Sequence, residues 1–144
     1  MTVGTSAGFG RRVAALLYDA VLLAALLVVF TSGAVLLNHR VAVERETAGA
    51  WVYLYRVGLI GVIAGYYLLN WTRSGQTLGM RAWHLRAVTP SGGPLGLKAA
   101  AWRLGFGLLA WAPAALGVLW LYVDPQHLAL HDRLSNTRIV HLPR

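Results

Sequence analysis

The chain has 144 residues, of which 57% are hydrophobic and 12% are charged, and its formal net charge is +8. A soluble domain is about 45–50% apolar and about 25% charged, so this composition excludes an ordinary soluble domain or a disordered chain and indicates an integral membrane protein. The excess of arginine is typical of cytoplasmic loops, and no basic helix face or stacking platform points to a nucleic-acid partner.

Two long apolar stretches come first along the chain. We expect membrane-spanning helices over residues 12–37 and 51–71, because each exceeds the roughly 20 residues that a span requires. The second stretch carries aromatic residues at both ends, which is typical of the membrane interfaces. Its Gly58, Gly61 and Gly65 fall on one helix face and predict a seam for close helix packing.

The third apolar stretch, residues 99–123, admits two topologies. Ala112-Pro113 near its middle offers a place to break the helix, which would make a re-entrant hairpin. That form keeps most arginines and lysines on one side of the membrane, as the positive-inside rule prefers. A continuous span would instead place Trp120 and Tyr122 in an outer aromatic belt, so both topologies stay open.

The loop over residues 72–98 and the tail over residues 124–144 are too polar to span a membrane. Leu78–Val88 and Thr137–Leu142 both have the pattern of strands, and we expect them to pair as a small cytoplasmic sheet. The prediction is one membrane domain over residues 1–144, of all-α class. It has two spanning helices, a third helix that is broken or spans, and this small sheet.

Charged residues inside the apolar stretches are the candidate functional groups. A carboxylate in hydrocarbon is costly unless it is paired, protonated or hydrated, which singles out Asp19. Arg103 enters the third stretch to a similar depth, so we expect a buried Asp19–Arg103 pair, either a neutral helix clamp or a proton or cation site. Arg12 lies on the face of Asp19, about 10 Å nearer the membrane surface. Arg56 is expected to extend toward the outer surface.

The tail carries further candidates. We expect Asp132 to pair with a cytoplasmic arginine, Arg12 or Arg81, and so to tie the tail to the helix ends. His127 and His131 stand four residues apart in a short predicted helix, but they are weak metal candidates because no third ligand has suitable spacing.

The chain carries no motif of a known catalytic class. No nucleophile elbow, phosphate loop or dinucleotide fingerprint is present in the sequence. Because there is no cysteine, thiol catalysis, disulfides and iron–sulfur clusters are excluded. We therefore expect neither enzymatic activity nor a cofactor.

Three segments together resemble a known family. They are Gly8-Phe9-x-Arg11-Arg12-x-Ala14-Ala15 with Tyr18-Asp19, then Gly75-Gln76-Thr77-Leu78-Gly79-Met80-Arg81, and Leu130-His131-Asp132-Arg133-Leu134-Ser135-Asn136-Thr137. With them the chain resembles the RDD family of bacterial membrane proteins, named for one arginine and two aspartates. Arg12, Asp19 and Asp132 match these positions, although Arg11 is adjacent to Arg12. Asn136 departs from the family, which often has glycine there.

The resemblance implies a multi-pass protein of the bacterial inner (cytoplasmic) membrane, and charge places its N-terminus in the cytoplasm. Cation/proton exchange is reported for some relatives, which implies a small, oligomeric transporter of monovalent cations or protons. In that role Asp19 would titrate beside Arg103, and Arg12 with Asp132 would form a cytoplasmic clamp. The alternative is a membrane scaffold or accessory subunit that binds a protein partner or anionic lipid.

Overall fold

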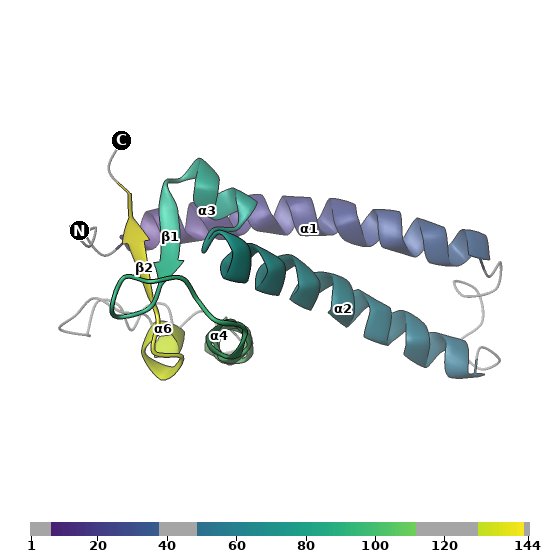
Figure 1. Ribbon diagram of the computed structural model, residues 1–144. Coiled ribbons are helices and arrows are strands. Elements are labelled where there is room, and N and C mark those ends of the chain that lie inside the picture. Colours follow the sequence, from purple (N-terminus) through teal and green to yellow (C-terminus); the bar gives the residue numbers. More distant parts are fainter. Residues whose placement is uncertain (1–6, 38–48, 112–129, 143–144) are drawn as a thin grey trace.

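The computed structural model describes residues 7–37, 49–111 and 130–142. Its elements, in chain order, are α1 (Phe9–Leu37), α2 (Gly49–Arg73), α3 (Leu78–Ala82), β1 (Leu85–Val88), α4 (Leu97–Trp111), α6 (Leu130–Leu134) and β2 (Arg138–His141). Figure 1 shows α1 and α2 as two long helices that extend from the end of the molecule where the short elements gather. We call this end, made of α3, β1, α4, α6 and β2, the head region.

The two long helices have the length and composition of membrane spans. α1 has 29 residues and α2 has 25, and the mean hydropathy of their most apolar windows is 2.7 and 1.5. A 25-residue helix is about 37 Å long, enough for a hydrocarbon core of about 30 Å. Only 6% of each window is buried. Their apolar side chains therefore face outward, which suits contact with lipid and does not suit the core of a soluble domain.

Contacts between the outer halves of α1 and α2 are few and specific. The ring of Phe30 stacks on Tyr55 with centroids 6.0 Å apart, and the hydroxyls of Tyr55 and Thr31 lie 2.9 Å apart. A Cβ at Gly58 would collide with the Phe30 ring, so this glycine permits the close approach of the two helices. Gly61 and Gly65, expected in the same seam, face open space among the described residues.

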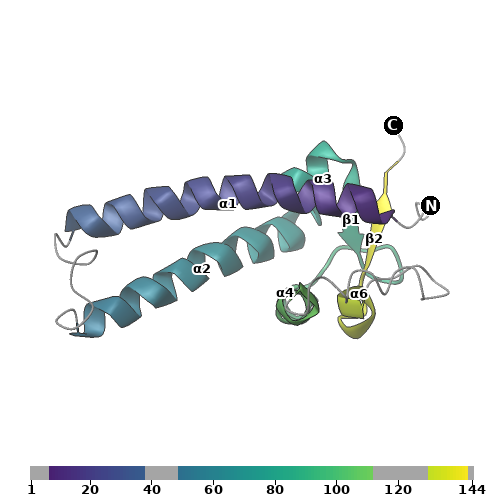
Figure 2. The same ribbon diagram turned by 180° about the vertical axis from the view of Figure 1, so that it is seen from behind.

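The third apolar stretch begins as α4, which does not run beside the long helices. Figure 1 shows α4 nearly end-on while α1 and α2 lie lengthwise, and Figure 2 shows the same crossing from behind. The described fold thus contains two helices able to span a membrane. The residues that distinguish a re-entrant hairpin from a third span are Ala112-Pro113, Trp120 and Tyr122. They lie outside the described residues.

The head region contains a small antiparallel sheet, as the sequence predicts. β1 pairs with β2 in a register that sets Leu85 opposite His141 and Val88 opposite Arg138. Two segments far apart in the sequence, the loop after α2 and the C-terminal tail, are thereby joined by backbone hydrogen bonds.

The expectation of one strand over Leu78–Val88 is wrong in its first half, where Leu78–Ala82 form helix α3. Thr77 caps this helix, since its hydroxyl accepts a hydrogen bond from the backbone N–H of Met80 at 3.1 Å. His84 then adopts a positive φ of 55°, which turns the chain from α3 into β1. Local capping thus overrides the extended pattern.

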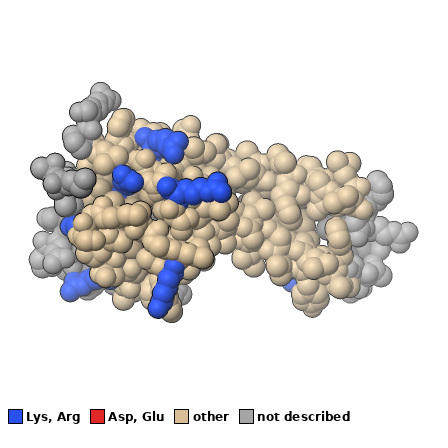
Figure 3. Space-filling view, viewed as in Figure 1, with Lys and Arg blue, Asp and Glu red and all other residues tan. Residues whose placement is uncertain are grey.

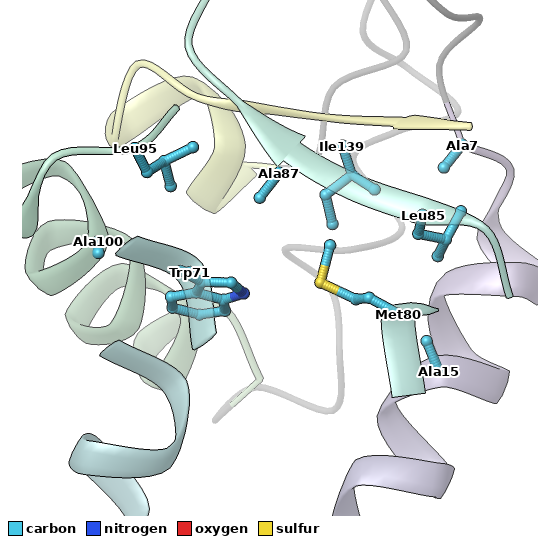
Figure 4. Packing of buried hydrophobic residues seen from close by; sticks show 9 residues of the cluster. All are labelled: Ala7, Ala15, Trp71, Met80, Leu85, Ala87, Leu95, Ala100 and Ile139. Carbon is cyan, nitrogen blue, oxygen red and sulfur yellow. The ribbon is translucent and has the colours of Figure 1, made fainter. Parts of the chain in front are cut away.

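The hydrophobic core lies in the head region, at the base of the long helices. Figure 4 shows Met80 and Ile139 pointing toward each other, with the Trp71 ring to one side of them. The core residues come from α1, α2, α3, both strands, α4 and two adjoining loops, and they are Ala7, Ala15, Trp71, Met80, Leu85, Ala87, Leu95, Ala100 and Ile139. The fold therefore places its buried interior where the two spans meet the short elements.

Candidate functional site

A buried cluster of one aspartate and two arginines lies at the centre of the head region. The Asp132 carboxylate of α6 contacts Nη1 of Arg12 from α1 through Oδ2, and Nη1 of Arg103 from α4 at 2.6 Å through Oδ1. Their exposed fractions are 0%, 6% and 2%, respectively. We call these three residues the Arg–Asp–Arg cluster. One carboxylate thus joins three helices from distant parts of the chain.

Further contacts fix both arginines of the cluster. Nε of Arg12 donates to the carbonyl oxygen of Ala7 at 2.9 Å, and Nη1 of Arg103 donates to the hydroxyl of Thr137 at 2.5 Å. The guanidinium of Arg103 also lies over the ring of Trp71, 5.2 Å from its centroid, as a cation–π pair. The cluster is therefore tied to α2 and to the residue that precedes β2 as well.

Asp19 forms a second buried site, deeper along α1. Its carboxylate is 3% exposed and accepts three hydrogen bonds from neutral donors. These come from the hydroxyl of Thr77 at 2.5 Å, the hydroxyl of Tyr66 at 2.6 Å and the backbone N–H of Gly79 at 2.8 Å. Asp19 thereby holds α1 against α2 and the start of α3, without an ion pair among the described residues.

The expected Asp19–Arg103 pair is not formed, because Arg103 binds Asp132 instead. Arg12 and Asp19 are separated by about 10 Å along the axis of α1. Since Arg103 shares a carboxylate with Arg12, it lies at the level of Arg12 and not at the deeper level of Asp19. The segment after α2 occupies the position beside Asp19 that the sequence analysis assigned to Arg103.

The structure also separates the candidate arginines. Arg12 is buried in the cluster, whereas the adjacent Arg11 is exposed. Asp132 contacts Arg12, and Arg81, the other partner considered, is exposed. Arg56, near the outer end of α2, is also exposed, which suits a side chain that extends toward the membrane surface.

The partners of Asp19 were not predicted from the sequence. Tyr66 belongs to the aromatic end of the second apolar stretch, and Gly79 lies within the segment that was expected to be a strand. One signal was available, because Thr77 stands three residues before Met80 in the position of a helix N-cap.

Gly79 is needed for the close approach of α3 to α1. A Cβ at this position would collide with the carbonyl oxygen of Ala15 and would lie 2.9 Å from the Asp19 carboxylate. Because Gly79 has no side chain, its backbone N–H can reach the carboxylate directly. The glycine is therefore part of the Asp19 site.

A cavity of about 250 Å³ lies between the two buried sites. Arg12, Asp19 and Arg103 all face it, and most of the remaining wall is apolar. The lining residues are Arg12, Ala15, Leu16, Asp19, Tyr67, Trp71, Thr77, Met80, Leu85, Arg103, Leu104, Gly107, Leu108 and Ile139. Five of these residues are labelled in Figure 4, namely Ala15, Trp71, Met80, Leu85 and Ile139. The cavity is thus bounded by both long helices, the head and the buried charges.

The described residues hold no group of three His, Cys, Asp or Glu side chains close enough to bind a metal. His127 lies outside the described residues, and the side chain of His131 is not described. The pKa of His141 is held below its ordinary value by desolvation, by Arg11 and by His84. The lowered pKa favours the neutral form of His141.

Comparison with known proteins places the chain in one family. The RDD family model matches residues 6–136, which include Arg12, Asp19, Arg103 and Asp132. The chain belongs to the RDD family. Together with its two apolar helices, this makes it an RDD family membrane protein. No curated protein and no solved structure matches the chain.

The first prediction concerns the Arg–Asp–Arg cluster of this RDD protein. Asp132→Asn removes the one negative charge between two buried guanidinium groups, and an uncompensated buried charge destabilises a protein by about 3–5 kcal/mol. We expect the free energy of unfolding to fall by that order in detergent-solubilised protein, followed by circular dichroism. Arg81→Gln, at an exposed position, is the matched control and should change it by less than about 0.5 kcal/mol. Equal stability of the two variants would refute the structural role of the cluster.

The second prediction concerns the contact between α3 and α1. Gly79→Ala inserts a methyl group against the Ala15 carbonyl, and such overpacking costs about 1–3 kcal/mol. We expect a lower midpoint of thermal unfolding. Gly10→Ala is the control, because a Cβ there meets no atom within 4 Å and alanine favours the helix. A Gly79→Ala variant that unfolds at or above the wild-type temperature would contradict this packing.

Proposed function

We propose that this RDD protein is a small transporter of the bacterial inner membrane that moves monovalent cations or protons, with Asp19 as the group that binds them. The observation that carries the proposal is the position of Asp19, a buried carboxylate on an apolar helix that faces a cavity. Ionisable residues inside membrane helices commonly mark ion pathways and proton relays.

The partners of Asp19 support this role. Both buried arginines are engaged with Asp132, whereas the donors to Asp19 are two hydroxyls and one backbone N–H. A carboxylate held only by neutral donors keeps its full negative charge, which a cation entering the cavity can compensate. With Asp19 ionised, the two arginines and two aspartates sum to zero charge, and protonation of Asp19 changes that sum by one.

The distribution of exposed charge supports a cytoplasmic head region. Figure 3 shows lysine and arginine side chains gathered on the head, and the long helices beyond it are almost free of them on that face. The exposed basic residues of the head and of the adjoining helix ends are Arg11, Arg73, Arg81, Lys98 and Arg133. By the positive-inside rule we place this end, with the N-terminus, in the cytoplasm.

We further propose that the protein works as a homo-oligomer. The described residues contain two helices able to span a membrane, which are too few to enclose a pathway, and only 6% of the most apolar window of each is buried within this one chain. Neighbouring copies would supply the missing walls through the outward-facing surfaces of α1 and α2.

The basic face favours a second candidate function. A scaffold or accessory subunit would use the same exposed arginines and lysines to bind anionic lipid or an acidic protein partner. In that case both buried sites serve only to hold the helices together.

The third prediction tests transport at Asp19. Purified protein in proteoliposomes with an internal pH dye should move protons in response to an imposed Na⁺, Li⁺ or K⁺ gradient. Asp19→Asn removes the ionisable group while keeping a similar shape, and we expect it to abolish this movement. Arg56→Gln is the matched control, because it removes an exposed charge from the other span and should leave the flux unchanged.

Circular dichroism would confirm that both variants are folded. Flux by Asp19→Asn equal to that of the wild type would refute the role of Asp19. No flux from folded wild-type protein would refute cation exchange and favour the scaffold. The scaffold would then have to bind anionic vesicles more tightly than neutral ones.

A further inference from the structure

We infer that the cavity beside Asp19 binds the anionic oxygen head of a membrane amphiphile, a carboxylate or a phosphate, with the apolar body of the ligand against the hydrocarbon walls. The inference goes beyond the proposed function, since it concerns binding in the cavity whether or not anything crosses the membrane. Four features of the wall carry it: its unused donors, its charge, its apolar surface and one glycine.

The first feature is a pair of unpaired hydrogen-bond donors, one on each of the two arginines that line the cavity. Arg12 uses Nε for Ala7 and Nη1 for Asp132, and its buried Nη2 has no hydrogen-bond partner among the described residues. Arg103 uses Nη1 for both Asp132 and Thr137, and its buried Nε likewise has none within the described part of the chain. A buried donor left without a partner is costly. Each guanidinium group would therefore be stabilised by a further hydrogen-bond acceptor.

The second feature is the balance of charge and acceptors. The two arginines share the single carboxylate of Asp132, which leaves this cluster with a surplus positive charge. Asp19 already accepts three hydrogen bonds and contributes no partner to either guanidinium. The ligand group that would satisfy the two arginines is therefore an anionic hydrogen-bond acceptor. Guanidinium groups bind carboxylate and phosphate oxygens most strongly because their donor geometry matches these groups.

The third feature is the apolar remainder of the wall, which selects the body of the ligand. A volume of about 250 Å³ is slightly below the roughly 300–1,000 Å³ of sites for drug-sized molecules, so the cavity fits a short apolar body or the first part of an acyl chain. Leu108 on the wall is 65% exposed, on the outward surface of α4. The cavity therefore borders an apolar outer surface of the molecule, and a ligand dissolved in the membrane can reach it from that side.

The fourth feature is Gly107, which faces the cavity from α4. A Cβ at this position would meet no atom within 4 Å, so the first atom of a larger side chain is accommodated there. Gly105 lies on the same helix, is exposed, is not part of the wall, and also has open space at its Cβ. The two glycines therefore provide a blocking variant and a matched control.

The fourth prediction is a binding experiment on the protein in phosphatidylcholine vesicles. The probe is dodecanoate with a bromine on carbon 2, next to its carboxylate, which quenches a tryptophan that it contacts, and Trp71 lines the cavity beside Arg103. We expect saturable quenching that is largely lost in Trp71→Phe. The uncharged bromododecanol, compared at equal membrane content, should bind at least about tenfold more weakly, because it lacks the anionic head. Gly107→Leu should raise the half-saturation concentration by at least about tenfold, and Gly105→Leu should leave it unchanged.

Competitors distinguish the sources of the anionic head. Displacement by dodecyl phosphate would extend the site to lipid phosphates, whereas resistance to it would restrict the site to carboxylates. Inorganic phosphate should displace the probe only at far higher concentration, because it has no apolar body. Equal binding of acid and alcohol, saturable quenching that survives Gly107→Leu, or displacement by inorganic phosphate as effective as by dodecyl phosphate would each overturn the inference. Cation flux is read separately, so failure of either proposal is distinguishable.

Discussion

The arrangement of this RDD protein depends on one carboxylate shared by two buried guanidinium groups. Asp132 lies near the C-terminus, Arg12 near the N-terminus and Arg103 between them, so their contacts close the chain on itself. A buried charge without a partner is far more costly than one that is paired, which makes each residue dependent on the other two. A backbone hydrogen bond also joins the two ends of the chain, because the N–H of Ala7 donates to the carbonyl oxygen of Ile139 in β2 at 3.1 Å.

The second anchor, at Asp19, explains why a cavity forms. α1 is held at two levels, by the cluster at Arg12 and by the hydrogen bonds of Asp19 about 10 Å deeper. At the level of Arg12, Arg103 ties α4 to the cluster. At the level of Asp19, α3 approaches α1 through Gly79. The space enclosed between these attachments is lined by residues of both levels and is not filled by side chains of the described residues.

Most elements of the fold could be predicted from local sequence patterns. The remaining features depend on contacts between residues far apart in the sequence. The two long helices follow from uninterrupted apolar stretches, and the paired strands follow from two short runs of strand pattern. Helix α3 was missed because its residues also suit a strand, and the deciding contact of Gly79 with Asp19 lies sixty positions away in the sequence. The Asp19–Arg103 pair was expected from the number of residues into each apolar stretch, but α4 crosses the long helices, so that number does not give the depth of Arg103.

The two proposals made for the cavity are physically linked. Asp19 and both arginines face the same cavity, whose walls are mostly apolar and therefore screen charges weakly. An anion held by the arginines and a cation held by Asp19 would attract each other across the cavity. Linkage then requires that each of them strengthens the binding of the other by the same factor. If both proposals hold, the RDD signature residues do more than hold three helices together, because their charges couple the two ligands of one cavity.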